Sequence, residues 1–511
     1  IDISYIVSLT PEQAQKSEVS GYASFENISK KYNIPIYYPK EYSLKHKQDI
    51  EFFQEQKLVK FQKVWYYHDF LHKNKNNFDM SYLSEFEKKY GIDLWNLAIN
   101  ERIFYRFNRI YKFSREEILN ILFQECKLFE SILDEIKPDF FITKVPPLHH
   151  HQLFYQICKA KGVKVLNLYL SRIGRKCIIS QETQHLDSTE SLNDVKGENR
   201  DFIELQNYLK SFNYSGRIKN YIKRRSSSKL NKIKAAIQFF LISNNTNNKN
   251  HYFYMGRTKS RVFFDTVIFS LKKKYRRNFV NNNLKSNVDL SEPFIYFALS
   301  NNEERNLLIS APFYTNQIEN IRHVAKSIPI GYKLYVKEHP AQEIRGWRPI
   351  SEYKEIMEIP NVILIHPSYS TEKLYQNCSL VITIGGTAGL DAAFYEKPSI
   401  IFSDLGYSIL PSVEKISSIH DLSKTIHLSL KKNVDSSDLD KYLILLDDNS
   451  FDFDLLDFEM KEHDCFYYGS ILTDVEIPIK KMEDFLFQNK TQIDLLSSEF
   501  EKKIKQFKEL N

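Results

Sequence analysis

From residue 294 onward, short apolar runs alternate with stretches of helical periodicity, and this alternation constrains the fold more than any other feature of the chain. The apolar runs are residues 294–300, 332–336, 362–365, 380–384 and 398–402, and helices are predicted over 317–327, 371–377 and 387–395. Apolar residues predominate along each run instead of occupying every second position, as in strands that are buried on both faces. We therefore predict a parallel sheet covered by helices, which is a Rossmann-like domain.

The first half of the chain shows a weaker form of the same pattern. Strands are predicted near residues 34–39, 138–143 and 163–170, with a helical insertion between 81 and 136. Because 511 residues are too many for a single core, we expect an α/β chain with two Rossmann-like domains. The predicted segments are an acceptor-side domain (1–184), a basic connector (185–290), a donor-binding domain (291–410) and a C-terminal helical segment (411–511) that ends in one long helix.

Positive charge is concentrated in the connector. Residues 210–277 hold 18 Lys and Arg against one acid, Asp265, in a chain whose net charge is +7. Such a block fits an anionic membrane surface, an acidic glycan or a solvated linker. Nucleic acid is not an expected partner, because no nucleic-acid-binding motif accompanies the charge.

The five cysteines form no C-x-x-C pair, which favours reduced thiols over a disulfide framework or a zinc site. The chain shows neither an apolar run of membrane-spanning length nor a signal-peptide pattern. We expect a cytoplasmic protein, with peripheral attachment at the inner face of the plasma membrane through residues 210–277.

A glycine-rich turn is the strongest local motif. Gly385, Gly386, Thr387 and Gly389 lie between a buried strand and a helix, where glycine lets the backbone approach a ligand and unpaired N–H groups favour an anion. Thr387 can cap the helix, and Asp391 can accept hydrogen bonds from a sugar hydroxyl. The alternative is a tight strand-to-helix turn without a ligand.

A second motif, Lys337-Glu338-His339-Pro340, follows the strand 332–336. Its ammonium and imidazole can donate to a pyrophosphate, and Pro340 stiffens the turn. Ligands of parallel sheets bind beyond the carboxyl ends of strands, so this turn and the glycine turn, at neighbouring strand ends, are predicted to converge on one phosphate.

The stretch from "IYFALSNNEERNLL" through "YKLYVKEHP" to "CSLVITIGGTAGLDAAFYEKPSIIF" resembles the C-terminal half of bacterial capsular and surface polysaccharide biosynthesis glycosyltransferases, the group that includes the capsule Kdo transferases. The resemblance covers about residues 294–402. It departs from the family where Asp391 replaces a frequent glutamate, and where Ser300 to Glu303 replace a stretch that often contains histidine.

The resemblance implies a GT-B fold and metal-independent transfer from a nucleotide sugar, CMP-linked or otherwise, to a capsule, lipopolysaccharide or other surface glycan. The donor is then a co-substrate and no cofactor is expected. The alternatives are a two-Rossmann nucleotide-sugar epimerase and a non-catalytic partner in envelope assembly. The implied donor site comprises Lys337, Glu338, His339, Pro340, Gly385, Gly386, Thr387, Gly389, Asp391, Ser300 and Glu303.

Candidates for the acceptor side come from the first half. His149 and His150, with Asp139 and Glu182 as carboxylate alternatives, are the groups predicted to accept the proton of the acceptor hydroxyl, and Arg172 and Arg175 are predicted to bind an anionic group. The adjacent histidines are not expected to hold a metal, because neighbouring positions point in different directions. Two D-x-D triplets, at 438–440 and 452–454, are interpreted as solvated loops or helix caps.

Overall fold

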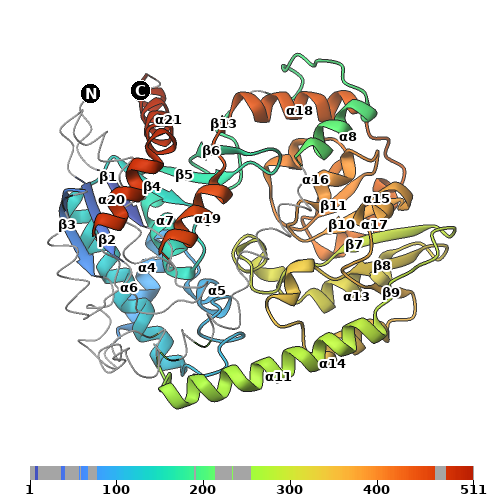
Figure 1. The fold of residues 1–511 in the computed structure, drawn as a ribbon, viewed down its shortest axis with the longest axis horizontal. Helices are drawn as coiled ribbons and strands as arrows, with labels where there is room; N and C mark the ends of the chain where they lie inside the picture. The colour runs from blue at the N-terminus through green and yellow to red at the C-terminus, as the bar shows by residue number, and fades with distance from the viewer. Residues whose placement is uncertain are drawn as a thin grey trace. The chain divides into compact units, whose positions relative to one another are not determined.

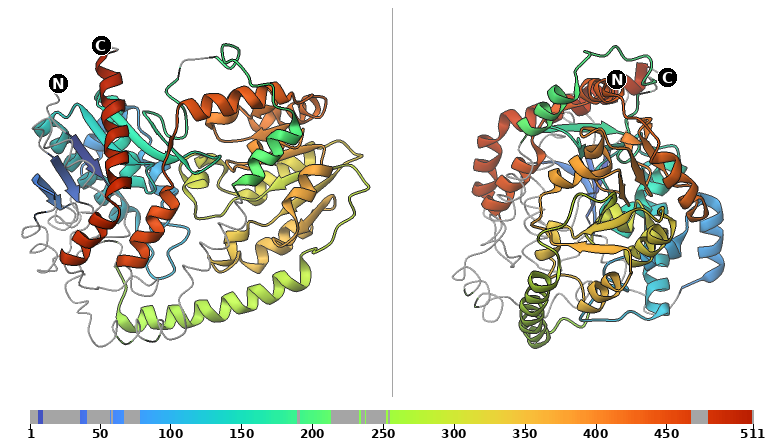
Figure 2. Two further views of the ribbon diagram at one scale, coloured as in Figure 1. Left: turned by 45° about the horizontal axis from the view of Figure 1, so that its top comes forward. Right: turned by 90° about the vertical axis from the view of Figure 1, so that its right-hand side faces the viewer.

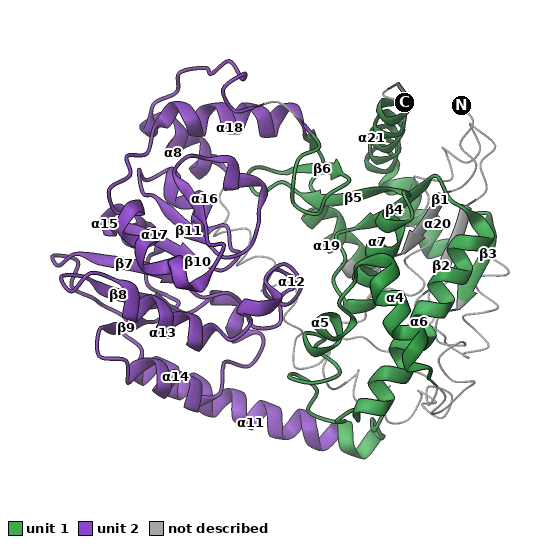
Figure 3. Cartoon of the chain, turned by 180° about the vertical axis from the view of Figure 1, so that it is seen from behind, with its two compact units in different colours: residues 1–187, 214–262, 450–511 green, residues 188–213, 263–449 purple. Residues whose placement is uncertain are grey.

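The computed structural model describes residues 6–9, 36–40, 57, 59–66, 78–188, 191–212, 233, 237, 252, 255–466 and 479–509. They form two compact units (Figure 3): unit 1 contains residues 1–187, 214–262 and 450–511, and unit 2 contains residues 188–213 and 263–449. The four domains predicted as continuous segments of the sequence stay a prediction. The two units are defined by contacts between residues, and each of them contains several segments of the chain. Most of the basic block before residue 255 lies outside the described residues.

Unit 1 is built on a mostly parallel sheet (Figure 1). In the described residues its seven strands have the order β13-β6-β5-β4-β1-β2-β3; β6 pairs antiparallel with both of its neighbours, β5 and β13, and the other pairings are parallel. The strands are β1 (Ile6–Leu9), β2 (Ile36–Lys40), β3 (Phe61–Tyr66), β4 (Phe140–Lys144), β5 (Lys164–Leu170), β6 (Lys176–Ser180) and β13 (Phe451–Asp452). The helices are α4 (Met80–Tyr90), α5 (Leu94–Ile99), α6 (Arg115–Ile136), α7 (His149–Ala160), α19 (Leu455–Phe466), α20 (Ile479–Gln488) and α21 (Lys490–Glu509).

Helices cover both faces of this sheet. Phe141 and Val165 point into a core formed with α4 to α7, which contains the predicted helical insertion. Phe140, Ile142 and Leu166 point the other way, against α19, α20 and α21. These C-terminal helices, coloured red in Figure 2, lie beside the sheet of unit 1. The C-terminal helices therefore complete the core of the unit that holds the N-terminal strands.

Unit 2 contains the six-stranded sheet that the apolar runs predict. In the described residues the order is β12-β11-β10-β7-β8-β9 and every pairing is parallel. Its strands are β7 (Phe294–Ala298), β8 (Lys333–Lys337), β9 (Val362–Ile365), β10 (Leu380–Thr383), β11 (Ser399–Ile401) and β12 (Val413–Lys415). Its α-helices are α8 (Phe202–Ser211), α11 (Lys259–Asn283, whose first turn belongs to unit 1), α12 (Arg305–Leu308), α13 (Gln317–Ser327), α14 (Ile350–Met357), α15 (Thr371–Asn377), α16 (Ala388–Ala393), α17 (Leu422–Ser429) and α18 (Ser436–Asp448). Short 3₁₀ helices are η4 (Pro312–Tyr314), η5 (Pro340–Glu343), η6 (Gly406–Ile409) and η7 (Ile419–Asp421).

The sheet of unit 2 is also covered on both faces. Ile295 and Leu334 face a core with α11, α13, α14 and α17, whereas Phe294 and Tyr335 face α15 and α16. In the sheet β7 lies between β8 and β10. The chain therefore adds β8 and β9 on one side of β7, and then adds β10, β11 and β12 on its other side. Two Rossmann-like units are present, and the predicted α/β fold with two Rossmann-like domains is confirmed.

Three expectations about the C-terminal region are wrong. The single long helix is two helices, α20 and α21, separated at Asn489. The region after residue 410 also contains two strands, β12 and β13. Asp440 of the first D-x-D triplet is buried instead of solvated: its carboxylate pairs with Arg200 at 2.5 Å and accepts a hydrogen bond from the backbone N–H of Glu198.

Within the part of the chain that the structure describes, no helix combines the length and apolar composition needed to cross a membrane.

Candidate functional site

The predicted donor-binding residues of unit 2 lie at the carboxyl ends of parallel strands. Ser300 follows β7, His339 follows β8 and Gly385 follows β10. The strands before the two predicted motifs are not neighbours, however, because β7 lies between β8 and β10. Two strand spacings separate the motifs by roughly 10 Å, and the loop after β7 lies between them at the switch point where open α/β sheets bind ligands.

Lys337 places a positively charged side chain at this carboxyl edge of the sheet. It is the last residue of β8, only 4% exposed, and its ammonium donates a hydrogen bond to Thr371 Oγ1 at the start of α15. No carboxylate pairs with Lys337 among the described residues. Burial lowers its pKa to about 8, because a buried ammonium without a counter-ion is destabilised. Such a group gains from an anionic ligand.

Glu338, the next residue, belongs to a buried ion pair. Its carboxylate binds Arg348 at 2.7 Å and accepts a hydrogen bond from the Tyr353 hydroxyl at 2.8 Å. The side chains of Glu338 and Arg348 are at most 1% exposed, and the backbone N–H of His339 donates to the same carboxylate at 2.7 Å. These contacts give Glu338 a positioning role in the turn, and the geometry argues against direct contact with a donor.

The same network holds the loop after β7. Arg348 donates to Ser300 O at 2.7 Å and to Asn302 Oδ1 at 2.5 Å. Gln317 donates to Ser300 O at 2.9 Å and accepts from the Ser300 N–H at 2.8 Å. The predicted site residue Ser300 thus contributes backbone atoms to the scaffold, and Glu303, half-buried beside it, pairs with Arg345 at 3.3 Å.

His339 forms a turn that orients its ring. Its Nδ1 accepts a hydrogen bond from the N–H of Ala341 at 3.1 Å, so the neutral ring carries its proton on Nε2. Pro340 is exposed and opens η5, and the imidazole is half-buried. His339 therefore offers an Nε2–H donor close to the end of β8.

The glycines of the second turn serve two purposes. A Cβ on Gly385 would lie 3.1 Å from the carbonyl oxygen of Asn306, and one on Gly389 would lie 2.8 Å from the Tyr407 hydroxyl. Tyr407 donates to Gly386 O at 2.6 Å. Gly389 is thus required for packing α16 against the sheet, whereas Gly385 and Gly386 form the turn at the strand end.

Thr387 does not cap α16. It has helical backbone angles and its side chain makes no capping hydrogen bond, so the capping prediction is wrong, and the residue is exposed. Asp391 is half-buried and accepts from the Tyr375 hydroxyl at 3.3 Å. α16 has only six residues, so its dipole is a minor attraction for an anion.

In unit 1, His149 begins α7 and is clamped between two buried carboxylates. Its Nδ1 lies 2.8 Å from Glu101 and its Nε2 lies 2.9 Å from Glu125. Burial opposes the charged ring, but the two glutamates outweigh burial and raise the pKa of His149 to about 10. With both nitrogens occupied and the ring protonated, His149 is unsuited to accept a proton from an acceptor hydroxyl.

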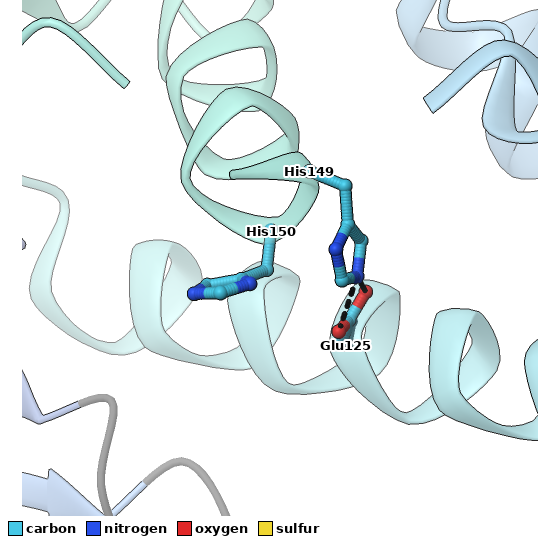
Figure 4. A group of neighbouring side chains, drawn as sticks. All are labelled: Glu125, His149 and His150. Carbon is cyan, nitrogen blue, oxygen red and sulfur yellow. Dashed lines mark hydrogen bonds and ion pairs between the residues drawn. The ribbon is translucent and has the colours of Figure 1, made fainter. Parts of the chain in front are cut away.

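His150 lies beside this pair (Figure 4). Its Nδ1 is 3.4 Å from the Tyr252 hydroxyl, and ligand atoms of Glu125, His149 and His150 lie within 4.8 Å of one another. These three residues form the group in the described chain whose geometry could hold a metal ion. Holding one would require His149 to give up its hydrogen bond to Glu125.

Asp139 and Glu182 lie away from the histidines. Asp139 precedes β4 and is exposed at the amino edge of the sheet. Glu182 pairs with Lys159 in the last turn of α7, about 15 Å along the helix from His149, and its pKa is lowered, because the ion pair outweighs partial burial. The structure does not bring the four predicted catalytic candidates together.

Arg172 and Arg175 belong to the connection between β5 and β6. Arg172 donates to Gln184 Oε1 at 2.6 Å. Arg175 is exposed and 3.9 Å from Asp454, a long surface ion pair. Arg175 remains accessible to an anionic group.

The fold and the site define an α/β protein with two Rossmann-like units and an anion-suited carboxyl edge in the second. Residues 204–410, which include β7 to β11, match the family described as capsule polysaccharide biosynthesis protein. Over these residues the chain is similar to that family, and the resemblance carried by its motifs is confirmed. A search of curated proteins finds no match.

Among solved structures, the chain is similar to UDP-GlcNAc 2-epimerase from Methanocaldococcus jannaschii, at 12% identity and a TM-score of 0.24, covering 86% of this chain and 98% of that one. It is also similar to KpsC, a beta Kdo 2,7 transferase from Thermosulfurimonas dismutans, at 11% identity and a TM-score of 0.27, covering 70% and 97%. Anabaena HepE, solved with UDP and glucose, matches at 9% identity and a TM-score of 0.23, covering 90% and 98%. Likeness at this level indicates no particular activity.

Proposed function

We propose that the chain is a glycosyltransferase that moves a sugar from a nucleotide-sugar donor to a capsule or another surface polysaccharide. The family match over residues 204–410 supports this proposal. The observation that carries it is Lys337, a buried ammonium without a carboxylate partner in the described chain, at the carboxyl edge beside the switch point of the same region.

In the proposed reaction, the donor phosphate lies between the end of β8 and the turn after β10. Lys337 and the Nε2–H of His339 stabilise the charge that develops on the departing phosphate, and the backbone around Gly386 and the hydroxyl of Thr387 bind its oxygens. Because these groups supply the positive charge and the hydrogen-bond donors, we propose that transfer needs no metal ion. Arg175 is the proposed contact for an anionic acceptor.

The replacement Lys337→Met tests the phosphate role. Removing a buried ammonium should leave the free energy of unfolding at pH 7 unchanged or raise it by up to about 3 kcal/mol, while binding of a nucleotide from a panel of CMP, CDP, UDP, GDP and TDP weakens at least about tenfold. In the native protein this affinity should fall as pH rises above about 8, where Lys337 loses its charge. A Lys337→Met protein that binds nucleotide as tightly as the native one would contradict the proposal.

Activity assays separate the reaction classes. His339→Ala and Thr387→Ala should each lose transfer activity while keeping the native unfolding midpoint, and EDTA should leave native activity unchanged. Incubation with the nucleotide sugar alone should give at most slow hydrolysis, whereas rapid formation of an isomeric donor would identify an epimerase. Failure to bind any nucleotide of the panel would favour a non-catalytic role.

A further inference from the structure

Helix α11 carries an apolar stripe on its solvent-facing side. Five large side chains form it, and they are between 41% and 70% exposed: Phe264, Val267, Ile268, Leu271 and Tyr275. At about 100° per residue they fall within an arc of roughly 100°, the width of the stripe that a helix normally buries. A stripe that a helix normally buries is left exposed here, and this makes it a candidate interaction surface.

The opposite face of α11 is already packed against unit 2. Val280 lies in the core under the sheet, and Arg276 donates to the carbonyl oxygen of Trp347 at 3.0 Å. The ring of Phe269 lies so close to Gly346 that a Cβ there would be 2.4 Å from it. One face therefore fixes the helix beside α14 (Figure 3), and the stripe points away from the core of unit 2.

Basic residues border the stripe on both sides. On the helical wheel Arg261 and Lys272 lie along one border and Lys274 along the other, and all three are exposed. Asp265, the acid of this helix, lies toward the packed face. An apolar stripe between two basic borders is complementary to a surface that is apolar inside and negatively charged outside.

We propose that α11 lies in the interface of an anionic lipid bilayer, with Phe264 and Leu271 inserted at the level of the headgroups. A second copy of the chain is a weaker fit. The stripe is about 17 Å long on a helix about 10 Å wide, which gives on the order of 200 Å², against the roughly 800 Å² per partner of a stable protein interface. A bilayer needs no matching pocket, and this surface lies outside the proposed donor site.

Flotation of the full chain with vesicles tests the proposal. The native protein should float with vesicles of phosphatidylcholine and phosphatidylserine, more strongly at low than at physiological salt, and much less with phosphatidylcholine alone. Leu271→Ser should weaken binding about tenfold. Lys272→Gln and Lys274→Gln should each weaken it about fivefold.

Matched controls exist in the same unit. Ile330 is fully exposed outside α11, so Ile330→Ser should bind like the native protein, as should Lys424→Gln and Lys431→Gln. Circular dichroism and transfer to a water-soluble acceptor should be unchanged in all variants, which keeps this test separate from the proposed activity.

Three results would overturn the proposal. The first is the absence of binding to the anionic vesicles at low salt. The second is binding that Leu271→Ser does not weaken, which would assign attachment to other basic residues. The third is a dimer in sedimentation that Leu271→Ser dissociates and vesicles do not compete for, which would identify a second copy as the occupant.

Discussion

At the scale of single residues, Arg348 connects the loops after β7 and β8. Replacing it with alanine would leave the Glu338 carboxylate buried without a cation, and Ser300 O and Asn302 Oδ1 would each lose one hydrogen-bond donor and keep Gln317 as the other. We expect Arg348→Ala to lower the free energy of unfolding by about 3–5 kcal/mol in urea denaturation. Arg345→Ala, which breaks an exposed ion pair with Glu303, should cost at most about 1 kcal/mol. Equal effects of the two replacements would show that the buried pair does not organise the site.

His149 should make stability depend on pH. The pKa of its ring is about 10 in the folded protein and about 6.5 in an unfolded chain, so the folded state holds more protons between these values. Its contribution is complete below pH 6.5 and is lost as pH rises to about 10. His149→Gln should lower the free energy of unfolding at pH 6 by about 3–5 kcal/mol and flatten the decline from pH 7 to 10, measured by urea denaturation at several pH values. The exposed His420→Gln should retain the native pH profile, and a native-like profile in His149→Gln would contradict the charged clamp.

Sequence could reveal only part of this chemistry. Lys337, His339 and the glycines stand next to apolar runs, so their place at strand ends follows from local pattern. Arg348, Gln317 and Asn302 gave no such signal, because their partners lie 10 to 48 residues away. The run of histidines predicts a catalytic base at His149. Its pairing with Glu101 and Glu125 is not visible in the sequence, because it depends on how α6 and α7 pack.

At the scale of elements, the buried strands were the easiest to predict, because continuous apolar runs report burial on both faces. β10 and α15 begin where the pattern places them. β12 and β13 have only three and two residues, too few for a period, and they form through pairing with β11 and β6. The sequence does not predict the break at Asn489, because both helices keep the same apolar periodicity.

The packing of α16 against β11 leads to a prediction for Gly389. Its Cβ position is 2.8 Å from the Tyr407 hydroxyl and 3.0 Å from a methyl group of Ile401. Tyr407 is fully buried, so it has little room to move. Gly389→Ala should cost about 1–3 kcal/mol of unfolding free energy and weaken nucleotide binding, because Tyr407 would release Gly386. Gly331→Ala, with no atom within 4 Å of its Cβ position, should be neutral within about 1 kcal/mol, and a neutral Gly389→Ala would mean that Tyr407 adapts without cost.

At the scale of the whole molecule, each unit draws residues from separate parts of the chain. Unit 1 depends on α19 to α21 to cover one face of its sheet. Two phenylalanines of α20 provide a matched test: Phe485 is 3% exposed in that core, whereas Phe487, two positions later, is 82% exposed. Phe485→Ser should cost at least about 3 kcal/mol and make unit 1 sensitive to limited proteolysis, while Phe487→Ser should change neither property.

The pattern of cleavage should show which segments of the chain lose packing together. If the C-terminal helices belong to the core of unit 1, proteolysis of Phe485→Ser should begin in residues 78–187 as well as after residue 450, because both segments lose the same packing. Fragments of unit 2 should persist, since its core is closed by its own helices on both faces of the sheet. Cleavage confined to residues 479–509, with the rest of unit 1 resistant, would instead make these helices an appendage whose removal the sheet tolerates.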